Sequence, residues 1–248
     1  MRIKNLLLVL LLPALLTACV AVNPGKSQNE KASEINVQLG MGYLQQGNLE
    51  LASEKLTKAL RQNRKSASAN NAYAILQDRL GQKDLAEQHY KEAIYLDPKD
   101  SQAANNYGAF LCRNNREAES EKHFLKALEN PLYKTPEYAY TNAAICLIKI
   151  DRKVVAKEYL QKALASKSDF SVALLAMGNL LFDEGSFDAA KLYVDRYHLV
   201  AKPTSRSLWL AIRNELEIDG DANVDELAER LKRDFPDSSE YKSWLEIQ

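Results

Sequence analysis

Three cysteines carry the most versatile side-chain chemistry in this chain of 248 residues: Cys19, Cys112 and Cys146. A cysteine acts as a nucleophile, a metal ligand or one half of a disulfide. A nucleophilic thiol needs a neighbouring base, usually a histidine, to remove its proton. No sequence pattern pairs a histidine with any of the three cysteines, so a catalytic thiol is not expected. Cys112 and Cys146 stand 34 positions apart, and that spacing requires a structural explanation.

The other groups capable of chemistry form no recognisable site. His89 and His123 are also 34 residues apart, and His198 stands alone. A zinc site needs three or four converging ligands, so we interpret the histidines as surface residues. Acidic pairs such as Glu119 and Glu121 have many charged neighbours, which is typical of solvated side chains. No HExxH, GxSxG, GxxxxGK[ST] or GxGxxG motif occurs. We therefore predict no enzyme activity, cofactor, metal site or small-molecule substrate.

The composition argues against electrostatic binding of nucleic acid and favours helices. Lysine plus arginine equals aspartate plus glutamate, with 33 of each, whereas nucleic-acid binding needs a clustered basic face. Only nine glycines and seven prolines occur, and alanine, leucine, glutamate, lysine and glutamine are frequent. These five residue types lose little side-chain freedom in a helix. The sequence therefore predicts an all-α protein.

The first eighteen residues have the pattern of a signal peptide. Arg2 and Lys4 precede an apolar run, Leu6 to Leu16, that is broken only by Pro13. This run is too short to cross a bilayer core of about 30 Å, so residues 1–18 are interpreted as a cleaved export signal. The alternative is a buried N-terminal helix, which would leave an apolar helix preceded by two cations with nothing to cover it.

The four residues LTAC that end at Cys19 resemble a bacterial lipobox. The resemblance implies that cleavage makes Cys19 the first residue and that it carries acyl chains, which together anchor a protein stably. Val20 replaces the aspartate that usually retains such proteins in the inner membrane, which implies sorting to the outer membrane. Residues 19–32 are small, polar and without pattern, and are predicted to be a flexible tether.

Beyond the tether the sequence repeats with a period of 34 residues. Each copy has glycine or alanine at its eighth position, where two antiparallel helices approach closely, and a large apolar residue at its twenty-fourth. Pro98, Pro131 and Pro203 follow second helices and prevent their continuation. The eighth positions are Gly40, Ala74, Gly108, Ala144 and Gly178.

This period and pattern resemble the tetratricopeptide repeat, in which each copy is a helical hairpin. The resemblance implies a right-handed superhelix of about six repeats. A terminal unit must cover the open end of such a stack, which accounts for the atypical C-terminus. The predicted units are 33–66, 67–100, 101–134, 137–170, 171–204, a degenerate sixth repeat at 205–236 and a capping helix at 238–247.

Cys112 is the twelfth residue of its repeat and Cys146 the tenth of the next, so both fall near the ends of neighbouring first helices, which lie side by side. An exported protein works in an oxidising compartment, where suitably placed thiols are joined. We therefore predict a disulfide between Cys112 and Cys146. The alternative is two buried free cysteines that act as small apolar residues.

The concave face of such a stack is built from the second, fifth, ninth, twelfth and thirteenth positions of each repeat. Apolar residues at several of these positions predict a groove for a helical or extended peptide of a partner protein. Alternatively, the residues of the first copy pack against the tether. The predicted groove residues are Val37, Met41, Leu44, Ile75, Tyr138 and Ile145.

A lipobox, about six repeats and a C-terminal helix together resemble the type IV pilus biogenesis lipoproteins of the PilF/PilW kind. The resemblance is closest in the third and fourth repeats, in NNYGAFLC at 105–112 and NAAIC at 142–146. Members are pilotins, which escort the pilus secretin to the outer membrane or stabilise its multimer. The resemblance implies that role here, with a secretin subunit as partner and the apolar groove of the first repeats as the contact.

Two other functions remain open on the sequence alone. A periplasmic lipoprotein adaptor that scaffolds a cell-wall hydrolase or protease would share the lipobox and the repeats. An anchored enzyme would require a pocket of converging titratable groups that the motifs do not reveal. The fold itself does not choose between them, because repeat proteins of this type have many partners.

Overall fold

The computed structural model describes residues 26–218 and 223–248. The predicted signal peptide 1–18, the lipidation residue Cys19 and tether residues 20–25 lie outside this part of the chain. The described part contains thirteen α-helices and no strand. The helices are α1 (Gln28–Gln45), α2 (Leu49–Gln62), α3 (Ala67–Arg79), α4 (Lys83–Leu96), α5 (Ser101–Arg113), α6 (Glu117–Leu128), α7 (Pro136–Lys149), α8 (Lys153–Ser166), α9 (Ser171–Asp183), α10 (Phe187–Val200), α11 (Ser205–Ile218), α12 (Val224–Asp234) and α13 (Ser239–Glu246).

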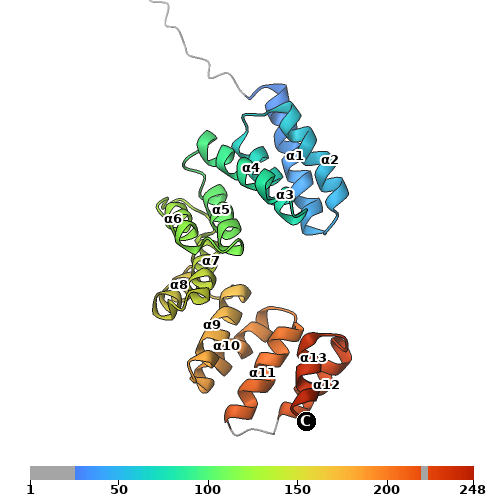
Figure 1. Ribbon diagram of the computed structural model, residues 1–248, viewed down its shortest axis with the longest axis vertical. Helices are drawn as coiled ribbons and strands as arrows, with labels where there is room; N and C mark the ends of the chain where they lie inside the picture. Colours follow the sequence, from blue (N-terminus) through green and yellow to red (C-terminus); the bar gives the residue numbers. More distant parts are fainter. Residues whose placement is uncertain (1–25, 219–222) are drawn as a thin grey trace, which may run out of the picture.

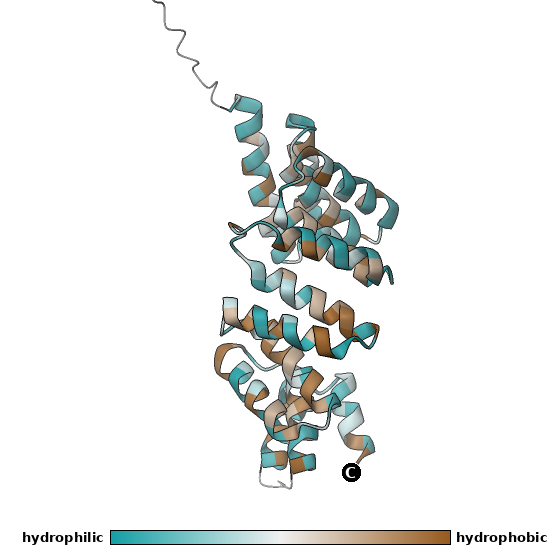
Figure 2. Ribbon diagram, turned by 90° about the vertical axis from the view of Figure 1, so that its left-hand side faces the viewer, coloured by the Kyte–Doolittle hydropathy of each residue, from teal (hydrophilic) through white to brown (hydrophobic). Residues whose placement is uncertain are grey.

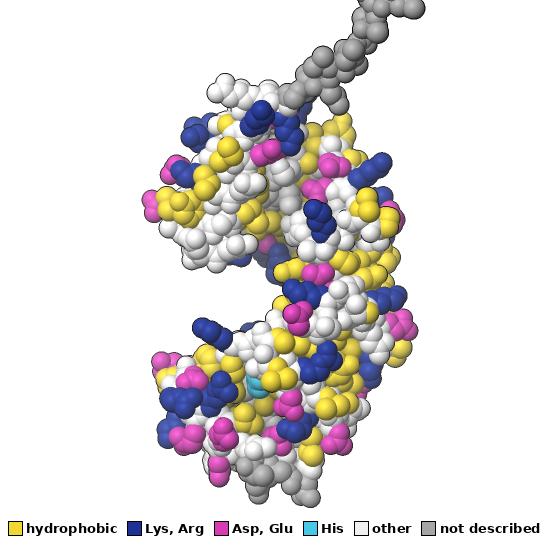
Figure 3. All heavy atoms as spheres, turned by 180° about the vertical axis from the view of Figure 1, so that it is seen from behind, with side chains coloured by type: hydrophobic (Ala, Val, Ile, Leu, Met, Phe, Trp, Pro, Cys, Tyr) yellow, Lys and Arg dark blue, Asp and Glu magenta, His cyan; other side chains and the backbone are white. Residues whose placement is uncertain are grey.

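The helices form a curved stack of hairpins. Within the first five repeats each odd-numbered helix packs most extensively against the even-numbered helix that follows it, and the odd-numbered helices α1 to α11 also contact one another in sequence. The stack curves into an open C (Figure 1), and the space-filling view shows a deep hollow between its N-terminal and C-terminal parts (Figure 3). The prediction of an all-α tetratricopeptide superhelix is confirmed.

The first helix begins earlier than the sequence pattern indicated. Helix α1 starts at Gln28, inside the segment 19–32 that was predicted to be a flexible tether. The cause is a capping box: the Glu30 amide donates to Ser27 Oγ at 3.2 Å, and the Ser27 amide donates to Glu30 Oε2 at 2.6 Å. Such reciprocal bonds satisfy amides that have no partner within the helix.

Close contact between the two helices of a hairpin depends on the small residue at the eighth position. A Cβ on Gly40 would lie 2.5 Å from Cγ of Leu56, and one on Gly108 would lie 2.8 Å from Cε1 of Phe124. Leu56 and Phe124 are both buried. An alanine in either glycine's place would overlap a core side chain.

The C-terminal helices close the end of the stack. Trp244 of α13 is 8% exposed and packs in one apolar cluster with Leu208 and Ile212 of α11 and Leu231 of α12. Figure 2 shows more hydrophobic (brown) residues in the middle and lower parts of the stack than in its upper, N-terminal part. Within residues 26–218 and 223–248, no helix is both long and apolar enough to cross a membrane.

Candidate partner-binding groove

The hollow of the C is lined by first helices, and it has a polar central part and an apolar C-terminal part. Its two cavities are formed mainly by residues of α3, α5, α7, α9 and α11. In Figure 1 the second helices α6 and α8 lie on the outer side of the curve. We call the whole lined hollow the concave groove.

The N-terminal repeat contributes less to the groove than the sequence suggested. Leu44 is 1% exposed and belongs to the core with Ala72 and Leu76 of α3, so its assignment to the groove was wrong. Val37 and Met41 are partly buried and pack against the same cluster. The neighbouring repeat thus covers part of this stripe.

The central part of the groove is a polar cavity of about 500 Å³ that contains two of the predicted residues, Ile75 and Tyr138. Side-chain amides bridge successive helices along it. Asn106 Nδ2 donates to Asn71 Oδ1 at 3.2 Å, and Asn142 Nδ2 donates to Asn105 Oδ1 at 3.0 Å. These bonds join α3 to α5 and α5 to α7 across the groove floor.

The C-terminal part is a more apolar cavity of about 650 Å³. The predicted residue Ile145 lies here, 39% exposed, opposite Val172 of α9, which is 47% exposed. Leu175 of α9 and Trp209 of α11 complete an apolar wall. Exposed apolar surface gathered in a hollow is typical of protein-binding sites.

The sixth repeat supplies three groove residues that the sequence reasoning missed. Arg206, Trp209 and Arg213 occupy the second, fifth and ninth positions of the unit 205–236, and all three line the apolar cavity. The rule that selected groove residues in the earlier copies would have found them. The weaker repeat pattern of this copy makes its register hard to recognise.

Four of the five cations that line the two cavities are held by partners within the protein. Arg79 donates to the Leu44 carbonyl at 2.7 Å, and Arg113 lies 2.5 Å from Asp78. Lys149 donates to the Cys112 carbonyl at 2.7 Å, and Arg206 Nε lies 3.7 Å from a carboxylate oxygen of Glu240. The fifth cation is Arg213, whose guanidinium lies over the rings of Phe182 and Trp209, 4.4 and 5.8 Å from their centroids.

Cys112 and Cys146 lie together between α5 and α7. Their Cα atoms are 5.8 Å apart and their sulfur atoms 2.29 Å apart, as a disulfide pair. Both side chains are buried, in one cluster with Phe124 and Ala143. The pair links the two central first helices directly behind the groove.

The histidines lie at the surface but are half-buried, and each has a partner within the protein. His89 Nδ1 lies 2.8 Å from Asn70 Oδ1, His123 stacks edge-on against Tyr107, and His198 Nε2 lies 3.0 Å from an oxygen of Ser207. Burial lowers the pKa of all three imidazoles. All three lie on second helices, α4, α6 and α10, and the repeat pattern does not show how far the next hairpin covers them.

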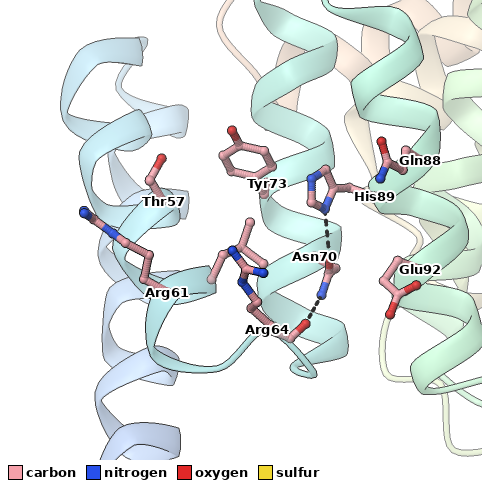
Figure 4. Close-up of a pocket in the computed structure, with 9 residues that line it drawn as sticks. Thr57, Arg61, Arg64, Asn70, Tyr73, Gln88, His89 and Glu92 are labelled. Carbon is pink, nitrogen blue, oxygen red and sulfur yellow. Dashed lines mark hydrogen bonds between the residues drawn. The ribbon is translucent and has the colours of Figure 1, made fainter.

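A separate cavity of about 490 Å³ lies between α2, α3 and α4 (Figure 4). Asn70 links its two sides, since its Nδ2 donates to the Arg64 carbonyl at 3.0 Å while its Oδ1 meets His89. Arg61 and Glu92 give the lining mixed charge. These bonds fix the turn between the first two repeats. Among the residues described, no group of three or more histidine, cysteine or acidic side chains is arranged to hold a metal.

Comparison with known proteins agrees with the repeat architecture. The tetratricopeptide repeat family matches residues 37–101 and 89–122. The type IV pilus assembly protein PilF of Pseudomonas aeruginosa is 32% identical over 242 residues, which cover 96% of each chain. A repeat fold and an assembly protein as relative indicate a scaffold.

Two solved structures resemble the whole described stack. The structure of Pseudomonas aeruginosa PilF has 30% identity and a TM-score of 0.78, and covers 90% of this chain and 100% of its own. The structure of PilW, a widely conserved type IV pilus biogenesis factor, has 29% identity and a TM-score of 0.78, and covers 89% and 100%. The chain therefore belongs to the PilF/PilW family of tetratricopeptide-repeat proteins of type IV pilus biogenesis.

Proposed function

We propose that this protein is a pilotin: an outer-membrane lipoprotein that binds the subunits of the type IV pilus secretin and promotes their localisation or assembly there. The observation that carries the proposal is the relationship to PilF along almost the whole chain, combined with an open groove that no segment of the described chain fills. The periplasmic adaptor is the weaker alternative, because both whole-length relatives belong to pilus assembly.

The mechanism we infer is capture followed by tethering. Lipid on Cys19 would hold the repeat domain at the outer membrane, and the concave groove would hold a segment of the secretin. Attachment of both to one surface raises the local concentration of subunits, and this favours their association without any new contact between them. In this mechanism the protein promotes secretin assembly by binding alone.

Candidate contacts for the secretin are the groove residues that remain accessible. Ile75 and Tyr138 line the central cavity, and Ile145 and Val172 line the apolar one. Val37 and Met41 stay candidates at the N-terminal end, where each keeps part of its surface open. A segment that contacts all of these would run along most of the stack.

The test is secretin assembly in a strain that lacks this gene. Membranes are fractionated, samples are left unheated, and the detergent-resistant secretin multimer is detected by blotting. The proposal expects the multimer to be lost or displaced to the inner membrane, and the intact gene to restore it. A Cys19→Ala variant should express but fail to restore it at the outer membrane. An unchanged outer-membrane multimer in the deletion strain would end the pilotin assignment.

A further inference from the structure

We propose that the C-terminal part of the concave groove recognises a carboxylate side chain set among apolar residues in the partner, and that Arg213 is the residue that binds it. The inference rests on the proposed function in one respect only: it takes the groove to be a protein-binding surface. It concerns the chemistry of the bound segment and holds for a secretin or another protein partner.

The position of Arg213 is unusual for a cation. Its Nε is buried without a hydrogen-bond partner, and no ion pair within 4.0 Å joins it to a carboxylate in the described part of the chain. Asp183 influences its charge only from a greater distance, and burial lowers the pKa of the guanidinium. Burying a charged group without a partner costs free energy. Nε itself is covered, but Arg213 as a whole is only partly buried. A ligand carboxylate at its accessible part would supply a counter-charge.

The aromatic rings around Arg213 hold it ready for such a ligand. The guanidinium lies over Phe182 and Trp209, and Phe182 is itself fixed edge-on against Phe187 with ring centroids 5.3 Å apart. Stacking restricts the side chain, while Arg213 remains partly exposed and lines the cavity. A guanidinium fork fits a carboxylate with two parallel bonds.

The charges of the lining point to an acidic occupant. Three cations line the apolar cavity, Lys149, Arg206 and Arg213, against one carboxylate, Glu240. Lys149 is already bound to Glu117 at 3.1 Å, and Arg206 meets Glu240. Among the described residues, Arg213 is the cation of this lining without an ion pair. Complementary charge selects the partner and fixes its register.

The apolar wall specifies what flanks the carboxylate. Ile145 and Val172 expose 39% and 47% of their surface beside the arginine, together with part of Leu175. An occupant therefore needs one or more aliphatic or aromatic side chains next to its acidic residue. A purely acidic segment would leave this surface uncovered, and a purely apolar one would leave the charge of Arg213 without a counter-charge.

The test uses a phage-displayed library of random dodecapeptides, selected in parallel on the full chain and on its Arg213→Gln variant, both purified in detergent. We expect peptides from the wild-type selection to be enriched in aspartate or glutamate beside apolar residues, and peptides from the variant selection not to be. Circular dichroism and thermal melting establish that the variant is folded.

The leading wild-type peptide is then measured by fluorescence anisotropy. Loss of a hydrogen bond to a charged group should weaken its binding to Arg213→Gln by about tenfold or more. Arg213→Lys should recover part of the affinity. Arg206→Gln, the matched control in the same cavity, should change it by less than about twofold, since Arg206 is 85% exposed. Replacing the acidic residue of the peptide by its amide should reproduce the loss.

Three results would overturn the inference. The first is a wild-type selection with no enrichment of acidic residues, and the second is a selection with no binding peptides at all. The third is an acidic peptide that binds Arg213→Gln as tightly as the wild type. Secretin assembly in cells is a separate readout, so failure of the pilotin assignment would leave these results interpretable.

Discussion

At the scale of single residues, Gly40 is where the first hairpin has least room. A Cβ there would meet Cγ of Leu56 at 2.5 Å, in the core of the repeat. We expect Gly40→Ala to lower the free energy of unfolding by about 1–3 kcal/mol, as overpacked cores do. Gly42, two residues further along α1, has open space where a Cβ would lie, with no atom within 4 Å. Gly42→Ala should be neutral or stabilise by up to about 1 kcal/mol. Urea titrations that gave both variants the same midpoint would contradict the packing described here.

A second residue-scale prediction concerns acid stability and Glu87. Burial opposes ionisation of this carboxyl, but hydrogen bonds from Lys91, Arg116 and Tyr107 outweigh burial and hold its pKa at about 2, below the ordinary 4.5. Because the pKa is lower in the folded state, ionised Glu87 stabilises the fold above about pH 4.5, and this contribution disappears as the pH falls toward 2.

Glu87→Gln should therefore be less stable than the wild type at pH 7, and the gap should narrow as the pH falls from 4.5 toward 2. Thermal melts over this pH range measure it, with exposed Glu158→Gln as the control that should follow the wild type throughout. A gap between Glu87→Gln and the wild type that does not depend on pH would refute the role of the carboxylate's ionisation.

At the scale of elements, the pair Cys112 and Cys146 links α5 to α7 and closes a loop of 34 residues. In the chain-entropy account, a cross-link over a loop of this length stabilises the fold by about 3–4 kcal/mol. We expect reduction to lower the urea midpoint of the wild type. A Cys112→Ala, Cys146→Ala double variant should unfold at a similarly low midpoint and should be insensitive to the reductant. A wild-type midpoint that reductant leaves unchanged would mean that the two thiols are not joined.

The helical hairpins were predictable from the sequence because their packing requires particular residue types at particular positions. Gly108 must be small against Phe124, and prolines after α4, α6 and α10 end those helices. The start of α1 was also encoded, in the spacing of Ser27 and Glu30, although the polar composition of the segment masked it. Local hydrogen bonding and close packing are thus visible in the sequence.

The groove was only partly predictable, since its exposure depends on how neighbouring hairpins are placed. Leu44 and Ile148 hold the same repeat position, yet Leu44 is covered by α3 whereas Ile148 reaches the apolar cavity. The periodicity identifies the face of each helix but not how closely the next repeat approaches it. The partners of Arg213 could not be read from the sequence for the same reason.

At the scale of the whole molecule, the C-shaped stack presents one continuous concave surface whose chemistry changes along its length. Its centre carries amides that bridge α3, α5 and α7, and its C-terminal part carries apolar side chains around an arginine. A partner segment that follows the groove would meet hydrogen-bonding groups first and an apolar pocket with one cation next. Such a gradient fixes the direction in which the segment lies.

The central claim is that the concave groove, rather than the outer surface, carries the partner. Val172 lies in the groove and is 47% exposed, whereas Val154 lies on the second helix α8 and is 74% exposed. Aspartate at either position adds the same charge to a solvent-accessible site, so the two variants form a matched pair.

The most direct measurement is recovery of the detergent-resistant secretin multimer in the deletion strain by each variant at equal expression. The account predicts that Val154→Asp restores the multimer as the wild type does. It predicts that Val172→Asp does not, because its carboxylate removes apolar surface, repels an acidic segment and competes for Arg213. The account would be contradicted if Val172→Asp restored the multimer fully, or if a folded Val154→Asp failed to restore it. Either result would place the binding surface outside the concave groove.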